Sequence, residues 1–170
     1  MARRCSDISA FSTLFDAASR LKSRGYSIMA SFLELQLMGY LKSSPWPLKL
    51  TMFAPDDEVL LRFSGDILGY SGLFMRHLLP CKLTYADIVG VKNGTFIKKN
   101  FEGLGTMIEE NDGDFFVNGV RITFPDLYVS DSLVIHGIGD AISQQIEEEE
   151  VEVEDKHVAF PVPPDANVRY

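Results

Sequence analysis

Apolar residues in the N-terminal part of the chain recur at helical spacing. Over residues 8–21 they return every three or four positions, which predicts an amphipathic helix that begins at Asp7 or Ser6. A second apolar segment, residues 28–38, predicts another helix that ends at Gly39. The chain is therefore expected to start with two consecutive helices.

The pattern changes after these helices. Residues 48–53 alternate between apolar and polar in the manner of a half-buried strand, and Pro55 ends this strand because proline has no amide to donate. Asp56 and Asp57 follow as helix-start residues, since a carboxylate there accepts unpaired amides and meets the positive end of the helix dipole. Residues 73–79 predict a further short helix.

Strand-type patterning dominates the second half of the chain. Two tight-turn dipeptides, Asp112-Gly113 and Asn118-Gly119, separate the first three of four short apolar runs. These runs cover residues 106–109, 115–117, 120–124 and 133–138. Helices followed by a meander of strands predict an α+β fold.

The negative charge of the chain is concentrated at one end. Residues 141–170 hold eight acidic and two basic residues, so the net charge of −8 leaves only −2 for the rest. This acidic, proline-containing segment cannot bury enough apolar surface to offset the entropy of ordering. We therefore expect one folded domain over residues 6–143 and a disordered acidic tail over residues 144–170.

The composition also argues against several classes of protein. The sequence lacks a basic stripe suited to a phosphate backbone, a run long enough to span a membrane, and an apolar secretion signal after its first residues. Cys5 and Cys81 are too few for a disulfide framework and lack zinc-ligand spacing. We interpret them as a terminal thiol and a half-buried loop thiol, and a bridge between them stays open.

Three blocks of the sequence resemble the signature blocks of fasciclin domains, in the order and spacing of that family. They are a strand running into Phe-Ala-Pro and a helix-capping residue, a central histidine before a turn, and an Asn-Gly strand followed by a Val-Ile-His strand. The residues that carry the resemblance, taken as mainly structural, are Phe53, Ala54, Pro55, Asp57, His77, Asn118, Gly119 and His136. The match covers roughly residues 8–142 and is most similar to single-domain plant fasciclin-like arabinogalactan proteins.

The resemblance implies a wedge-shaped β-sandwich flanked by helices, without catalytic machinery, cofactor or metal. It further implies an extracellular role, in cell adhesion or in organising the matrix or plant cell wall, through contacts with proteins or glycans. Asn93 begins the single N-glycosylation sequon and is the glycosylation candidate. Arg76 stands where the family usually has tyrosine, which weakens any transfer of the integrin-binding role proposed for animal relatives.

Two other functions stay open at this point. A small apolar ligand could be carried between the helices and the wedge. Alternatively, His77 could work with Asp56 and Asp57 as an acid-base hydrolase, because histidine and carboxylate are common proton carriers. We interpret His77 and His136 instead as core histidines with satisfied hydrogen bonds, because each lies among apolar residues. The oligomeric state is not predicted.

Overall fold

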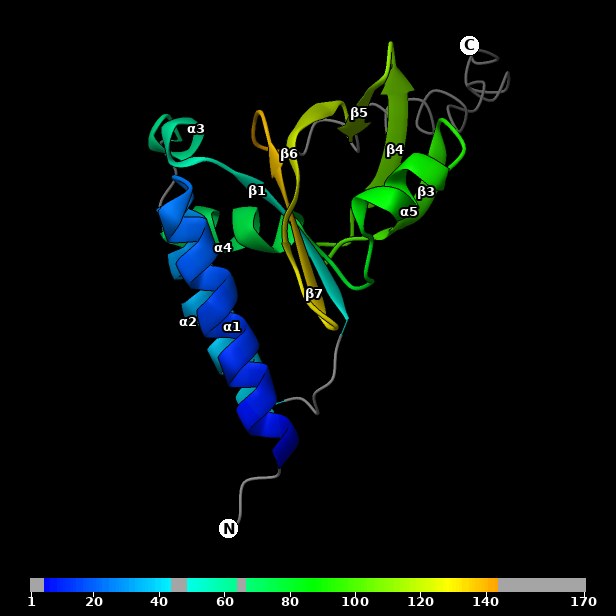
Figure 1. The fold of residues 1–170 in the computed structure, drawn as a ribbon. Helices are drawn as coiled ribbons and strands as arrows, with labels where there is room; N and C mark the ends of the chain where they lie inside the picture. Colours follow the sequence, from blue (N-terminus) through cyan, green and yellow to red (C-terminus); the bar gives the residue numbers. More distant parts are fainter. Residues whose placement is uncertain (1–4, 44–48, 64–66, 144–170) are drawn as a thin grey trace, which may run out of the picture.

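The structure, a computed structural model, describes residues 5–43, 49–63 and 67–143. These residues form helices and a single hydrogen-bonded sheet, in which the helices precede most of the strands (Figure 1). The elements in chain order are α1 (Cys5–Ser23), α2 (Ser27–Ser43), β1 (Leu50–Pro55), α3 (Asp57–Leu61), α4 (Ile67–Arg76), β2 (Leu78–Leu79), α5 (Tyr85–Gly90), β3 (Thr95–Lys99), β4 (Gly105–Asn111), β5 (Asp114–Val117), β6 (Val120–Val129) and β7 (Leu133–Ile138). The predicted α+β class is confirmed.

The described part of the sheet has seven strands in the order β2-β1-β7-β6-β5-β4-β3. Strands β1 and β7 pair in parallel, and the other neighbours are antiparallel. Every residue of β1 and β7 is buried. This fits their nearly continuous apolar sequences, because a strand covered on both faces has no solvent side on which polar residues would alternate.

Strand β6 connects one half of the sheet, β2-β1-β7, to the other half, β5-β4-β3. Its register shifts between Phe124 and Tyr128, which pair with Gly137 and Ile135, so residues 125–127 bulge opposite His136. A bulge bends a strand and increases its local twist. One hydrophobic cluster lies between helices α1, α2 and α4 and the β1–β7 half, and the second lies among α5 and strands of both halves. This arrangement agrees with the expected wedge flanked by helices.

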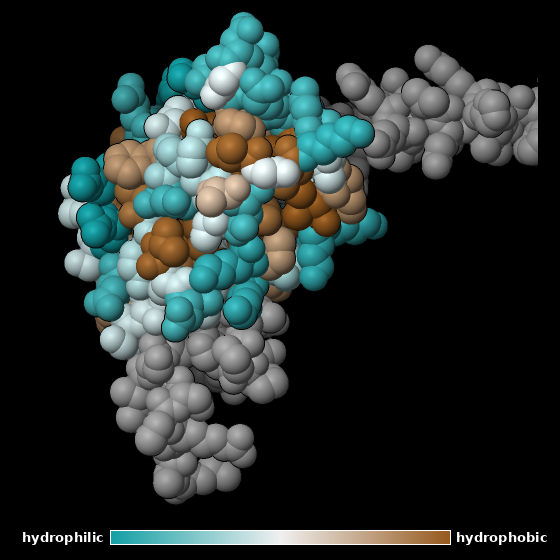
Figure 2. Space-filling model, turned by 45° about the vertical axis from the view of Figure 1, so that its right-hand side comes forward, coloured by the Kyte–Doolittle hydropathy of each residue, from teal (hydrophilic) through white to brown (hydrophobic). Residues whose placement is uncertain are grey.

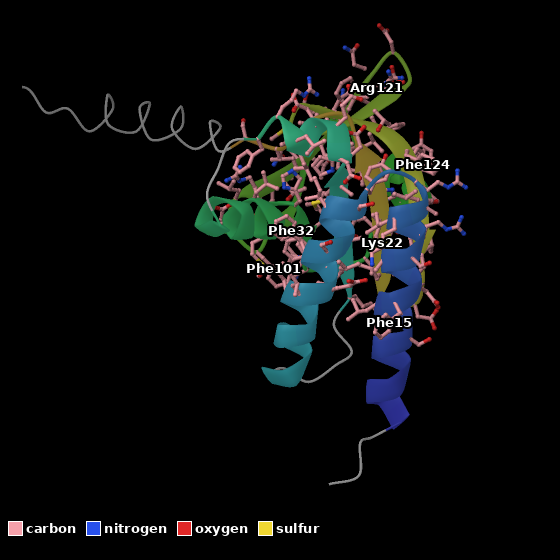
Figure 3. All side chains as sticks on the ribbon, turned by 90° about the vertical axis from the view of Figure 1, so that its left-hand side faces the viewer. Phe15, Lys22, Phe32, Phe101, Arg121 and Phe124 are labelled. Carbon is pink, nitrogen blue, oxygen red and sulfur yellow. The ribbon has the colours of Figure 1, made fainter. Side chains whose placement is uncertain are left out.

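The centre of β7 requires a residue without a side chain. A Cβ atom added at Gly137 would collide with the Tyr26 hydroxyl and lie 2.8 Å from the Phe124 Cβ. Figure 3 places Phe124 beside the turn that joins α1 and α2, where the Arg24 guanidinium lies 5.6 Å from its ring centroid. The glycine therefore lets the α1–α2 turn approach the sheet closely.

Several predicted boundaries are wrong. Helix α2 runs through Gly39 to Ser43, and the helix predicted over residues 73–79 ends at Arg76, after which Leu78–Leu79 form β2 beside β1. At Leu78 and Leu79 the apolar spacing suits a helix, but the backbone pairs with β1 instead. The sequence patterns also missed β3. The predicted tail lies outside the described residues.

Other local predictions hold. Pro55 is the last residue of β1. Both predicted turn dipeptides have positive φ at each residue, from 48° at Asn118 to 84° at Gly113, as hairpin turns of the mirror-image type require. Cys81 is a half-buried free thiol, and burial raises its pKa.

Candidate functional site

His77 is fully buried between the end of α4 and the start of β2. Its Nδ1 lies 2.6 Å from the carbonyl oxygen of Leu73, and its Nε2 lies 2.9 Å from the amide nitrogen of Ile142. Because the Ile142 amide can only donate, Nε2 accepts and Nδ1 carries the proton. Burial lowers the pKa of His77 to about 4. The neutral ring therefore uses both nitrogens to hold backbone groups.

Arg76 completes a clamp on the same residue. Its guanidinium donates to the carbonyl oxygen of Ile142 at 2.9 Å, and its Nε pairs with the Glu102 carboxylate at 2.9 Å. The Arg76 and His77 side chains thus bind the two backbone groups of Ile142, which lies 65 positions beyond His77 in the sequence. We call Arg76 and His77 the Ile142 clamp.

His136 plays a similar part from β7, with the other tautomer. Its Nε2 donates to the carbonyl oxygen of Leu83 at 2.7 Å, and its Nδ1 accepts the amide of Asp126 at 2.9 Å. Asp126 belongs to the β6 bulge and has a φ of 50°, and its carboxylate accepts the amide of Tyr85 at the start of α5. His136 therefore links β7, the bulge and the segment before α5, and burial lowers its pKa.

A buried threonine holds the same connecting segment. The Thr51 hydroxyl donates to the carbonyl oxygen of Cys81 and accepts the amide of Leu83, both at 2.7 Å. Leu83 is consequently bound through its amide by β1 and through its carbonyl by β7. Phe53, next but one along β1, stacks on the His136 ring with centroids 5.8 Å apart. Thr51, Phe53 and His136 thus pack together, and the polar groups of Thr51 and His136 all have hydrogen-bond partners.

The two aspartates cap different helices. The Asp56 carboxylate accepts the amide of Val59 at 2.9 Å, so its predicted role at the start of α3 is confirmed. Asp57 lies in the first turn of α3, but its carboxylate accepts the amides of Ser27 and Ile28 at 3.0 and 2.8 Å. It therefore caps α2, a partner that local sequence patterns do not show.

Asn118 anchors the turn between β5 and β6. Its side-chain oxygen accepts the amide of Met107 at 2.8 Å, and its side-chain nitrogen donates to the carbonyl of Gly105 at 2.9 Å. Gly119 supplies the second positive φ of this turn, at 79°. Together they fix the hairpin against β4.

Asn93 is exposed in the turn that precedes β3. Its side-chain oxygen accepts the amide of Glu110 at 3.0 Å. An N-glycan would attach to the other terminal atom of the side chain, Nδ2. The position is therefore accessible while its orientation is fixed by β4.

The histidines and aspartates do not form a shared reactive centre. Both ring nitrogens of His77 and of His136 contact backbone groups, and Asp56 and Asp57 cap helices. Within the described ranges, no three His, Cys, Asp or Glu side chains come together as metal ligands. No helix in the described part of the chain is both long and apolar enough to cross a membrane. Four of the predicted motif residues, His77, His136, Asp57 and Asn118, bind backbone groups of another segment of the chain.

Sequence reasoning missed four of these connectors. Thr51, Asn100, Asp126 and the guanidinium of Arg76 join segments that are far apart in the chain. The Asn100 side chain, for example, donates to the carbonyl of Arg76 at 2.8 Å and accepts two amides of its own loop. Thr51 and Asn100 are buried, so a polar residue at a core position was the available signal for these two, but the partners of all four depend on the tertiary fold.

Comparison with known proteins finds relatives among plant proteins. The chain is 33% identical over 144 residues to fasciclin-like arabinogalactan protein 20 of Arabidopsis thaliana, covering 84% of this chain and 33% of the relative. It is 30% identical over 127 residues to fasciclin-like arabinogalactan protein 21 of the same species. This match covers 72% of this chain and 35% of the relative. The chain thus spans about a third of the length of these curated relatives.

The chain matches no family model. Among solved structures, it is similar to a FAS1 domain pair from the insect cell adhesion molecule fasciclin I, with a TM-score of 0.46 and 11% identity, covering 76% of this chain and 45% of that chain.

Proposed function

This chain belongs to the family of fasciclin-like arabinogalactan proteins, and we propose that it is a non-enzymatic adhesion module of the extracellular matrix or plant cell wall. The module comprises residues 6–143 and acts through surface contacts with proteins or glycans. The observation that carries the proposal is that the two motif histidines form hydrogen bonds to the backbone inside the fold and have no ring nitrogen left for chemistry. His77 and His136, the strongest candidates for chemistry, are fully buried and bound to backbone on both ring nitrogens.

Surface recognition is also compatible with the exterior of the molecule. Figure 2 shows hydrophobic residues exposed in separate clusters among hydrophilic ones. Phe96 and Met107 are paired across β3 and β4 and are 54% and 39% exposed. Aromatic residues and methionine are enriched at protein interfaces relative to the rest of a surface. The rigid sheet would present such side chains without a large cost for ordering them.

The proposal is tested by binding and by turnover in parallel. The purified protein is immobilised and exposed to arrays of cell-wall glycans and to extracted wall proteins, and the same preparation is screened for hydrolase activity. We expect saturable binding to one of the two classes and no turnover. The matched variant Phe96→Ala changes an exposed side chain and tests whether the β3–β4 face contributes. An activity that disappears in His77→Asn, with folding preserved, would overturn the proposal.

We also propose Asn93 as a glycosylation site in the secreted protein. Its exposure in a turn that contains Gly94, which has a φ of 76°, supports access by the modifying enzyme. The chain fused to a secretion leader is expressed in plant cells, and its intact mass is measured before and after glycosidase. We expect a loss of mass that Asn93→Gln abolishes. An unchanged mass in the parent would refute the assignment.

A further inference from the structure

The strand at one end of the sheet carries positive charge. Strand β3 is the last strand of the described sheet, so one of its edges has no partner strand among the described residues. Lys92, Lys98 and Lys99 are exposed on this strand and the turn before it. Residues 88–101 contain these three lysines and no acidic residue, in a chain whose net charge is −8. We call the three lysines the basic edge.

Lysines on an edge strand have an ordinary explanation. An unpaired edge is a template for pairing with other chains, and lysines or bulges reduce that risk. Strand β3 has both, since its register shifts between Phe96 and Lys98. Lys98 also donates a long hydrogen bond of 3.4 Å to the carbonyl of Pro80, which leaves two of its three ammonium hydrogens for other partners. A role beyond edge protection needs an additional observation.

That observation is the place where the described chain ends. The Ile142 clamp holds the backbone of Ile142 on Arg76 and His77. The residue that follows β3, Asn100, donates to the carbonyl of the same Arg76 at 2.8 Å. Ile142 and the residue that follows β3 are therefore both hydrogen-bonded to the same residue, Arg76, and Ile142 also to the next one, His77.

The sequence that follows Ser143 has the complementary charge. Residues 147–155 include seven acidic side chains, namely Glu147, Glu148, Glu149, Glu150, Glu152, Glu154 and Asp155. Four residues of extended chain reach roughly 13 Å, and a five-residue strand such as β3 is about 16 Å long. Residues 147–155 can therefore reach the whole basic edge from the clamped position of Ile142.

We propose that the basic edge is a docking surface for the acidic segment 147–155 of the same chain. The contact is electrostatic, with carboxylates facing Lys99 first and Lys92 last. Because the three lysines are exposed, the contact contributes little to stability and is weakened by salt. An acidic partner of the basic edge would therefore compete with the segment for the same lysines. The Ile142 clamp sets the starting point of the segment.

The test uses the full chain made in bacteria, so that Asn93 carries no glycan. One variant replaces the six glutamates of residues 147–155 by glutamine and also carries Asp155→Asn. These substitutions remove the charges and keep the size of each side chain nearly the same. Backbone amide chemical shifts of residues 92–100 are compared between parent and variant. At low ionic strength, we expect the chemical shifts of these amides to differ between the parent and the variant. The differences should largely disappear in about 1 M salt, where the screening length falls to roughly 3 Å.

Two further variants make the outcome specific. The double variant Lys98→Gln with Lys99→Gln should abolish the dependence of β3 shifts on the charge of residues 147–155. The control Lys22→Gln, on α1, removes an exposed lysine that pairs with Glu34 and should leave that dependence intact. Identical β3 shifts in the parent and the neutralised variant would overturn the proposal. Differences that grow with protein concentration would also overturn it, because they indicate contact between copies.

Discussion

Replacement of His77 by alanine tests whether the central motif residue is structural. The substitution removes the donor to the Leu73 carbonyl and the acceptor of the Ile142 amide, which are 2.6 and 2.9 Å from the ring nitrogens. Both backbone groups then stay buried without a partner, and the ring leaves a void. Arg76 still binds the Ile142 carbonyl, so the clamp is weakened on one side only.

The expected loss of stability follows from these two groups. A buried polar group left without a partner costs about 1–3 kcal/mol. Two such groups and a small void give a loss of roughly 3–5 kcal/mol in the free energy of unfolding, because part of the strain relaxes. Each kcal/mol lowers the melting temperature by about 2–8 °C for domains of this size. The lower limits of these two ranges together give an expected fall of at least about 6 °C for His77→Ala.

The measurement is thermal unfolding of the variant beside the parent, with two comparisons. His77→Asn retains a donor near the position of Nδ1 but cannot reach Ile142, so its stability should lie between those of the parent and the alanine variant. His157→Ala, in the segment outside the described residues, should leave the melting temperature unchanged. An alanine variant as stable as the parent would refute the structural role. Loss of a parental activity in the same variant would favour the hydrolase alternative.

Three further perturbations follow from the structure. Because burial lowers the pKa of His77 from 6.5 to about 4 and also lowers that of His136, the unfolded chain binds protons that the folded chain does not. Stability is full above pH 6.5 and falls as the pH approaches 4, by up to about 3 kcal/mol for His77, so equal melting temperatures at pH 7.5 and 4.5 would contradict this. Gly137→Ala should cost about 1–3 kcal/mol through overpacking, measured by denaturant unfolding, and a neutral result would show that the α1–α2 turn can move. Deletion of residues 147–170 should change the melting temperature by less than about 4 °C, and a larger fall in a thermal scan would show extensive packing on the domain.

Local signals predicted the parts of the fold that depend on neighbouring residues. The Asp56 cap and the turn at Asn118 and Gly119 need only a few consecutive residues, and both are present. The end of α2 at Gly39 was predicted wrongly, because one glycine costs a helix only about 1 kcal/mol, which other contacts can offset. Strand β3 was missed because its bulge interrupts the alternation of apolar and polar residues.

The candidate site depends more strongly on the tertiary fold. The apolar residues around His77 and His136 in the sequence indicated that both are core residues, but they could not name Ile142 and Leu83 as the partners. The same limit applies to Asp57, whose carboxylate binds α2 about thirty positions earlier in the chain. Such contacts join residues that only the sheet order and the bend at β6 bring together.

The Ile142 clamp also bears on where recognition takes place. Arg76 stands where the resembling family usually has a tyrosine, and its side chain is only 13% exposed, with Glu102 and the Ile142 carbonyl as partners. A charged group that is already paired and mostly buried has little to offer a binding partner, and withdrawing it would remove a donor from the Ile142 carbonyl and break the ion pair with Glu102. Recognition through position 76 would therefore require opening the clamp. The exposed face of β3 and β4, with Phe96 and Met107, is available without such a cost.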